Sequence, residues 1–208
     1  MYAYQFCSPS RASLQSGRLP VHVNIDDSPL LAYNPNDTSG GYNGIPPQMT
    51  TLATKLRQAG YRTYATGKWD CGMAMPRMTP VGRGYESFLG FFSHANDYYD
   101  QTLSVLGTGT VTCNNEYPDF WLDNGPASVL INTAYEEDLF TNYSLTKIWS
   151  HDVSEPMFLF HSFHLIHSPL QVPQRALDMF AGVDYWLRKK ILAMTWCAWP
   201  ARGAGLTP

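Results

Sequence analysis

The sequence has little charge and no long run of apolar residues. Only 15% of its 208 residues are charged, and the formal net charge is −3, so the composition offers no basic face for nucleic acid. No apolar segment is long enough to span a bilayer, so we expect no transmembrane segment. The opening residues, MYAYQFC, lack the basic flank and the long apolar region of a signal peptide. We therefore expect either a cytosolic protein or a chain whose true beginning is missing.

Cysteine is scarce, and its spacing argues against one class of metal site. No two of the four cysteines form a Cys-x-x-Cys pair, so a zinc cluster is not expected. They are Cys7, Cys71, Cys113 and Cys197. Two glycosylation sequons, at 36–38 and 142–144, would suit a secreted glycoprotein, although such triplets often arise by chance.

The sequence does have enough apolar residues for one packed domain. Hydrophobic residues make up 44% of the chain, and 13 Tyr, 10 Phe and 6 Trp favour a packed interior. Leu52, Leu56 and Ala59 lie on one helical stripe that Gly60 closes as a C-terminal cap, and a short strand follows at 61–66. This order of helix, glycine and strand predicts an α/β layer.

The remaining elements are assigned more coarsely. Proline, glycine, asparagine and aspartate indicate loop over 19–48, and most of 76–130 is an aromatic-rich loop with turns, one of them at 123–125. Apolar spacing predicts helices at 135–150 and 184–194, and a largely apolar run at 155–165 predicts a buried strand.

The stretch QFCSPSRASLQSGR, at 5–18, sets a cysteine at the start of a helix. Pro9 suits the first helical position and Ser8 can cap, which places Cys7 at the helix N-terminus. Free backbone N–H groups and the helix dipole favour an anion there. Arg11 lies one turn further on, and its side chain can lean back toward that end. The local chemistry therefore suits an anionic ligand beside a cysteine-derived group.

This stretch resembles the signature of the formylglycine-dependent sulfatases, Cys-x-Pro-Ser-Arg followed by Gly-Arg. The resemblance implies that a formylglycine-generating enzyme oxidises Cys7 to an aldehyde, whose hydrate supplies the hydroxyl that attacks sulfur and the hydroxyl that later expels sulfate. Arg11 would orient this group. Gln15 and Ser16 depart from the family pattern without touching the reactive atoms.

A second stretch, AGYRTYATGKWDCG at 59–72, resembles the family signature that ends in Gly-Lys-Trp-His and then Gly. The match assigns Lys68 as a lysine that contacts the sulfate. Asp70 stands where the family usually has histidine. A carboxylate is anionic at neutral pH and cannot donate, so this departure is expected to repel sulfate and to weaken activity.

Further matches follow in family order over about 2–194. TPVGRGYESFLGFFSHANDYYD, DFW and DLFTNYSLTKI resemble landmarks of the arylsulfatase B-like subgroup, which includes N-acetylgalactosamine-4-sulfatase. HSFHLIHSPLQVP resembles a further one and aligns His167 with the histidine that contacts the sulfate ester and its leaving oxygen. Four other histidines have no such match and are interpreted as structural or surface groups: His94, His151, His161 and His164.

The family's calcium site is expected to be incomplete. The family places an Asp-Asp pair before the cysteine and an Asp-Asn or Asp-Gln pair well after the histidine, but only six residues precede Cys7. Asp26 and Asp27 follow the cysteine, and Asp123 and Asn124 precede the histidine and are better read as a turn. Of the family's Ca²⁺ ligands only the Cys7-derived group remains, while the cation requires about six or more oxygens.

The resemblance implies the α/β sandwich of the sulfatase and alkaline phosphatase superfamily, built on a large mixed central sheet. We expect part of this fold over 1–194, without its N-terminal strand and C-terminal part, and a divergent tail at 195–208. The implied activity is arylsulfatase-type hydrolysis of a sulfate ester, with a sulfated sugar as candidate substrate. Cys7, Arg11 and His167 would be catalytic, and Lys68 and His167 would bind substrate.

Two alternatives stay open. The chain could be a catalytically dead fragment or pseudoenzyme that binds sulfated glycans. It could also be another enzyme of the superfamily, such as a phosphatase, but a phosphatase would have Ser or Thr in place of Cys7. The family works in the secretory pathway, in lysosomes or outside the cell, and the sequence does not place this chain among those compartments.

Overall fold

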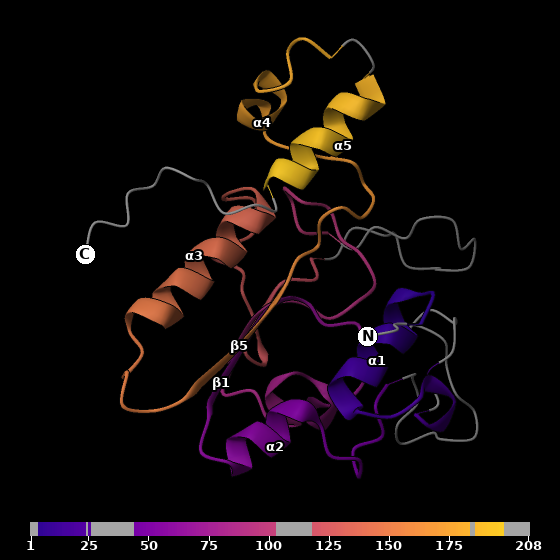
Figure 1. The fold of residues 1–208 in the computed structure, drawn as a ribbon, viewed down its shortest axis with the longest axis vertical. Coiled ribbons are helices and arrows are strands. Elements are labelled where there is room, and N and C mark those ends of the chain that lie inside the picture. Colours follow the sequence, from indigo (N-terminus) through magenta and orange to yellow (C-terminus); the bar gives the residue numbers. More distant parts are fainter. Residues whose placement is uncertain (1–3, 24, 26–43, 103–117, 184–185, 198–208) are drawn as a thin grey trace.

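The computed structural model describes residues 4–23, 25, 44–102, 118–183 and 186–197 (Figure 1). One mixed sheet of five strands forms its centre, in the order β4-β3-β2-β1-β5. Three neighbouring strands are parallel, namely β2 (Ser87–Phe91), β1 (Arg62–Lys68) and β5 (Met157–Ser162). A short antiparallel hairpin, β3 (Trp121–Leu122) and β4 (Gly125–Pro126), extends the sheet beyond β2.

Helices cover both faces of this sheet (Figure 1). The α-helices are α1 (Cys7–Ser16), α2 (Leu52–Gln58), α3 (Glu136–Trp149), α4 (Gln174–Asp178) and α5 (Trp186–Cys197). In the described residues, short 3-10 helices accompany them: η1 (Pro20–His22), η2 (Pro76–Met78) and η3 (Val81–Arg83). None of the helices within the described ranges is both long and apolar enough to cross a membrane.

The alternation of side chains along β2 separates two cores. Phe88 packs in the cluster that contains Ala12 of α1 and Ala53 of α2. Leu89 points to the opposite face, where it packs in the cluster that contains Phe140 of α3. Successive strand residues face opposite sides of a sheet, so this one strand holds α1 and α2 on one face and α3 on the other.

The carboxyl ends of the parallel strands meet at one edge of the sheet. Gly67 pairs with Gly90 of β2 and with Ser162 of β5. Its φ is +92°, and a Cβ there would lie 1.8 Å from the Ser162 carbonyl oxygen, so only glycine fits. Lys68 follows directly and ends β1. In open α/β sheets this edge is where ligands bind.

The structure confirms the helix that begins at Leu52, the strand that follows it, helix α3, strand β5, and a turn at Asp123 and Asn124. Strand β2, the hairpin and α4 were not predicted, because glycine and aromatic residues obscure the strand period and α4 is only five residues long. The strand β5 is half-buried rather than fully buried. Asp26 and Asp27 lie outside the described residues.

Candidate active site

Cys7 is the first residue of α1. The helix begins two residues earlier than predicted: Phe6 is its N-cap, without a side-chain cap, and Pro9 lies inside the first turn. The prediction that Ser8 caps the helix is wrong, because the Ser8 hydroxyl instead donates to Asp70 Oδ1 at 3.1 Å. The helix N-terminus nevertheless presents Cys7 with the free N–H groups and the dipole that favour an anion.

Arg11 fixes α1 to the edge of the sheet. Its Nη1 donates to the carbonyl oxygen of Lys68 at 2.7 Å and to Ser162 Oγ at 2.6 Å. One guanidinium therefore joins the helix to the last residues of β1 and β5. Because Arg11 lies one turn after Cys7, these two bonds also hold Cys7 above the carboxyl end of the parallel strands.

Lys68 and Asp70 form a buried ion pair at this edge. Lys68 Nζ lies 3.2 Å from Asp70 Oδ2, and the two side chains are 2% and 0% exposed. The ammonium makes no hydrogen bond within the described part of the chain. Burial raises the pKa of Asp70, but the hydrogen bond from His94 and the charges of Lys68, His94 and Arg11 outweigh burial and hold the pKa below its usual value. Asp70 is therefore a carboxylate, and Lys68 retains N–H donors for an anionic ligand.

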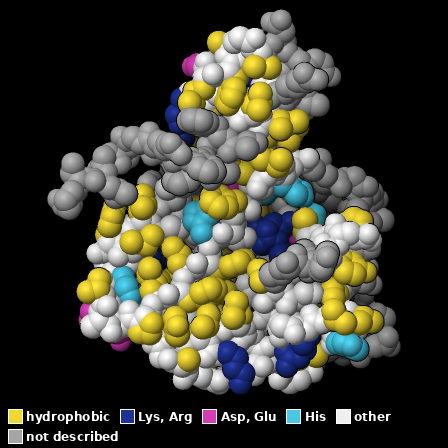
Figure 2. All heavy atoms as spheres, viewed as in Figure 1, with side chains coloured by type: hydrophobic (Ala, Val, Ile, Leu, Met, Phe, Trp, Pro, Cys, Tyr) yellow, Lys and Arg dark blue, Asp and Glu magenta, His cyan; other side chains and the backbone are white. Residues whose placement is uncertain are grey.

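Two histidines complete the site above Cys7. His94 follows β2, and its Nδ1 donates to Asp70 Oδ2 at 3.2 Å. His167 lies in the loop after β5, and its Nδ1 donates to the carbonyl oxygen of Ser168 at 2.8 Å. The two rings are 5.2 Å apart and nearly perpendicular. Figure 2 shows histidine and basic side chains gathered near the centre of the face that it draws.

The structure thus brings together all four predicted site residues and adds one that the sequence interpretation missed. Cys7, Arg11, Lys68 and His167 come from α1, β1 and the loop after β5. His94 was interpreted as structural or surface, yet it contacts both Asp70 and His167. Its position directly after a strand of the parallel sheet was the available signal, but β2 itself was not recognised.

The thiol of Cys7 is activated by its surroundings. The hydrogen bond with His167 is the largest cause and lowers the pKa to about 6; burial opposes it, while the charges of Lys68 and His94 assist. By contrast, Cys71 is fully buried, and burial raises its pKa far above the usual value. At neutral pH Cys7 is therefore a thiolate and a nucleophile, whereas Cys71 is inert.

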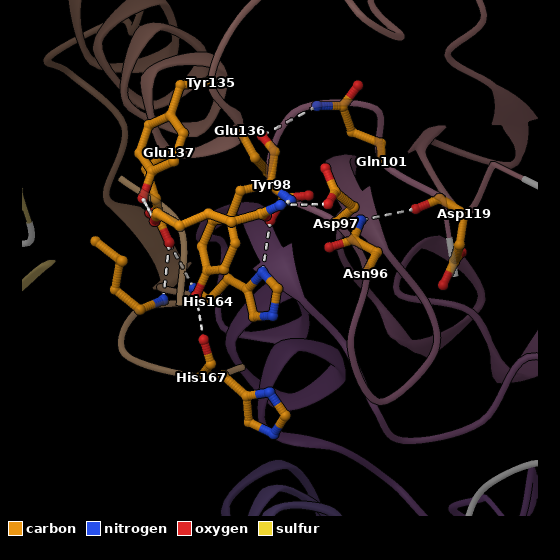
Figure 3. Close-up of polar contacts among 12 residues, drawn as sticks. Asn96, Asp97, Tyr98, Gln101, Asp119, Tyr135, Glu136, Glu137, His164 and His167 are labelled. Atoms are coloured by element: carbon orange, nitrogen blue, oxygen red, sulfur yellow. Dashed lines mark hydrogen bonds and ion pairs between the residues drawn. The ribbon is translucent and has the colours of Figure 1, made fainter. Parts of the chain in front are cut away.

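A second polar cluster supports the loop that carries His167 (Figure 3). Glu137 Oε1 accepts the backbone N–H groups of His164 at 2.7 Å and of Leu165 at 2.9 Å. Glu136 Oε1 lies 2.9 Å from His164 Nδ1. The hydroxyl of Tyr98 donates to the carbonyl oxygen of His167 at 3.0 Å. These contacts fix both ends of the segment from His164 to His167.

Burial controls the charges of this second cluster. Burial is the main cause that raises the pKa of Glu136 well above its usual value and the pKa of Glu137 to about 7. Burial also lowers the pKa of His164 well below its usual value, with the nearby cations adding to the effect. Glu136 and His164 are therefore uncharged at neutral pH, whereas Glu137 titrates near pH 7.

The donors around Cys7 do not fit calcium. Among the residues that the structure describes, only Cys7, His94 and His167 form a group of three or more potential metal ligands, with one ligand atom of each within 4.8 Å of the others. These are sulfur and nitrogen donors, whereas Ca²⁺ takes about six to eight oxygens. The carboxylate of Asp70 is close by, but it is buried and held by Ser8, Lys68 and His94.

Several solved structures share the fold of this chain. The crystal structure of Ps i-CgsB matches with a TM-score of 0.73 at 22% identity, over 92% of this chain and 42% of that one. A second structure, in complex with its substrate D-glucosamine-2-N,6-O-disulfate, matches with a TM-score of 0.60 at 21% identity, over 88% of this chain and 30% of that one. At these identities the likeness shows the fold.

Sequence comparison extends from fold to family. The chain is 28% identical over 200 residues to arylsulfatase J from Mus musculus, covering 94% of this chain and 31% of that protein. It spans about a third of the length of the curated relatives it matches. The family model described as Sulfatase matches residues 1–191. The site described above lies within this range, and the chain belongs to the sulfatase family.

Proposed function

We propose that this chain carries the nucleophile and the sulfate-binding groups of an arylsulfatase-type sulfuric ester hydrolase. One observation supports this most: the Lys68 ammonium is buried at the same sheet edge as Cys7, and although it forms an ion pair with Asp70 it makes no well-aligned hydrogen bond within the described residues. Buried N–H groups without well-aligned acceptors are costly, and sulfate oxygens would satisfy them. The helix N-terminus at Cys7 adds further donors for the same anion.

In this proposal Cys7 is oxidised to formylglycine by a formylglycine-generating enzyme. The hydrated aldehyde supplies one hydroxyl that displaces the alcohol from sulfur and a second that releases sulfate. The chain's own residues prepare this chemistry. Lys68 binds sulfate oxygens, and Arg11 orients residue 7 by fixing α1 to β1 and β5. No step here is assigned to calcium, because the described donors do not suit that ion.

His167 is suited to move the proton. Its Nδ1–H is held by the Ser168 carbonyl, which can only accept, so in the neutral ring Nε2 carries no proton. Nε2 can take a proton from the attacking hydroxyl and give it to the leaving oxygen, which is general base and then general acid catalysis. A ring nitrogen of His167 lies within 4.8 Å of Cys7 Sγ, which supports this assignment.

Asp70 takes a different role from the one that the sequence suggested. Its carboxylate is fully buried, and Lys68 and His94 balance its charge, which weakens its repulsion of a sulfate. It also holds His94 by Nδ1, so an imidazole stands beside Cys7 although the histidine of the family signature is replaced. We assign His94 as a further sulfate contact.

A sulfated sugar is the proposed substrate class, supported by the fold neighbour with a disulfated glucosamine bound as its substrate. The alternative is a chain that binds sulfated glycans without hydrolysing them. The Lys68–Asp70 ion pair favours that alternative, because it neutralises a lysine that would otherwise act on the sulfate alone.

The experiment is to co-express the chain with a formylglycine-generating enzyme and to measure conversion of Cys7 by mass spectrometry of its tryptic peptide. We expect conversion at Cys7 and none at buried Cys71. Converted protein is then tested on an aryl sulfate beside Cys7→Ala. Turnover that depends on conversion supports hydrolysis, and saturable sulfate binding without turnover supports the binding module. An unmodified Cys7 beside a converted control peptide would contradict the proposed nucleophile.

A further inference from the structure

Three segments far apart in the sequence bring potential soft-metal ligands to one point. Cys7 begins α1, His94 follows β2, and His167 lies in the loop after β5. The Cys7 Sγ and one nitrogen of each histidine lie within 4.8 Å of one another. The absence of Cys-x-x-Cys pairs argues against a cysteine cluster, but not against a site assembled by the fold from distant residues.

Both histidines are held in the manner of metal ligands. His94 Nδ1 donates to the Asp70 carboxylate, and His167 Nδ1 donates to a backbone carbonyl. In the neutral ring, each Nε2 therefore carries no proton, and its lone pair can bind a metal ion. Metal-binding histidines almost always have their other N–H held by a carboxylate or a carbonyl, because this fixes the ring and its tautomer.

The geometry points to a zinc site: we propose that, while Cys7 remains a thiol, Cys7, His94 and His167 bind Zn²⁺ with an open fourth position. One thiolate and two imidazoles are donors that zinc prefers over magnesium or calcium. Zn–S and Zn–N distances of about 2.3 and 2.0 Å require the ligand atoms to approach one another by roughly 1 Å. The His94 side chain is 48% exposed, so it can make this adjustment and the ion can enter from solvent.

The surrounding charges permit a cation here. Lys68 and Arg11 are positive, but the Asp70 carboxylate forms an ion pair with Lys68, and the thiolate adds a second negative charge. A bound zinc ion would occupy the sulfur that a formylglycine-generating enzyme must oxidise. Zinc would therefore protect the unconverted thiol, a property that goes beyond sulfate-ester hydrolysis and does not depend on it.

The test uses the full, untagged chain with Cys7 verified as a thiol by mass spectrometry. Zinc affinity is measured by competition with a chromophoric chelator, and cobalt is added separately as a spectroscopic probe. We expect one ion per chain and a thiolate-to-cobalt absorption band. Cys7→Ser, His94→Asn and His167→Asn should each weaken zinc affinity by at least about 100-fold. Asp70→Asn changes only the residue that holds His94, and it should weaken zinc affinity by about tenfold.

Matched controls keep the result specific. Cys71→Ser and His151→Asn remove a thiol and an imidazole elsewhere and should leave zinc affinity unchanged. If Cys7→Ser fails to fold, the rate of Cys7 alkylation is measured in the unaltered chain with and without zinc. We expect zinc to slow this alkylation. Equal alkylation at saturating zinc, or a cobalt band unchanged by Cys7→Ser, would overturn the proposal. Either outcome leaves the conversion of Cys7 to be judged by its own experiment.

Discussion

His167 lies between two pairs of an acidic residue and a histidine, which share a hydrogen-bond pattern but differ in exposure and in nearby charge. Its ring is 5.2 Å from that of His94 and 5.7 Å from that of His164. In each pair a histidine Nδ1 meets an oxygen of an acidic side chain, at 3.2 Å for Asp70–His94 and 2.9 Å for Glu136–His164. The His94 side chain is 48% exposed, whereas the other three side chains are fully buried.

The charges around each pair decide which form it takes. Cations surround Asp70, so it stays ionised in spite of burial. Glu136 is raised in pKa by burial first and then by the neighbouring carboxylate of Glu137, so it is a neutral acid. One chemical pair is thus ionic at the sheet edge and neutral in the interior. Both acids have a histidine beside them, so the histidine does not distinguish them. The cations near Asp70 do, because they keep a buried acid ionised at the candidate active site.

The largest effect is expected from removing the two histidines separately. His164→Ala should lower the free energy of unfolding by about 4 kcal/mol, because it opens a cavity beside Tyr98 and leaves the buried Glu136 without its partner. His94→Ala should cost less than about 1 kcal/mol, since the His94 side chain is half-exposed and the buried Asp70 keeps Ser8 and Lys68 as partners. Urea unfolding of both variants measures the contrast. Equal losses would mean that the two settings do not differ.

A pH titration of stability sharpens the same contrast. Glu137 has a pKa of about 7 in the folded protein, above its unfolded value of 4.5. The folded state therefore holds this proton more tightly, so its stabilising contribution is complete below the unfolded pKa and is lost as the pH rises through about 7. The loss is roughly 3 kcal/mol between about pH 4 and about pH 8.

The matched variant is Glu137→Gln, which keeps a carbonyl oxygen for the two backbone N–H groups but does not titrate. The difference in unfolding free energy between the unaltered chain and Glu137→Gln should therefore change with pH in the stated direction. A difference that stays constant across this range would show that Glu137 is not a titrating group of the second polar cluster.

A smaller effect is expected on the alkylation rate of the Cys7 thiol. His167→Asn removes the main cause of the lowered pKa of Cys7, so its alkylation at neutral pH should slow by about tenfold or more and its midpoint should move up from about pH 6. His151→Asn is the control. Mass spectrometry resolves Cys7 from Cys71, which should stay unreactive in the folded chain. An unchanged midpoint in His167→Asn would show that His167 does not act on the thiol.

The comparison also shows what the sequence could predict. The order of short motifs indicated Cys7, Arg11, Lys68 and His167. The fold brings them together because α1, the end of β1 and the loop after β5 meet at one edge of the sheet. His94 could not be found this way. Its meeting with Asp70 follows from the register of β1 and β2, in which Lys68 pairs with Phe91, so that the residues after both strands become neighbours.

The two glutamates of α3 escaped prediction for another reason. Glu136 and Glu137 open an amphipathic helix, where acidic residues usually complement the dipole in solvent. Here both are buried against the loop that carries His167. Single-sequence patterns show which helix face is apolar, but they do not show which loop will cover a helix end, because that contact joins residues distant in the chain.

The sulfate site is tested most directly by the rate of Cys7 alkylation in the thiol form as inorganic sulfate is added, with a chelator present and ionic strength held by chloride. Sulfate bound by Lys68 beside the thiolate should slow alkylation in a saturable way. This protection should be lost in Lys68→Met and kept in the exposed control Lys55→Met. Within each variant only the ratio of rates with and without sulfate is compared, because Lys68 also affects the thiol. Saturable protection that depends on Lys68 is the predicted result, and equal rates with and without sulfate in the unaltered chain would contradict it.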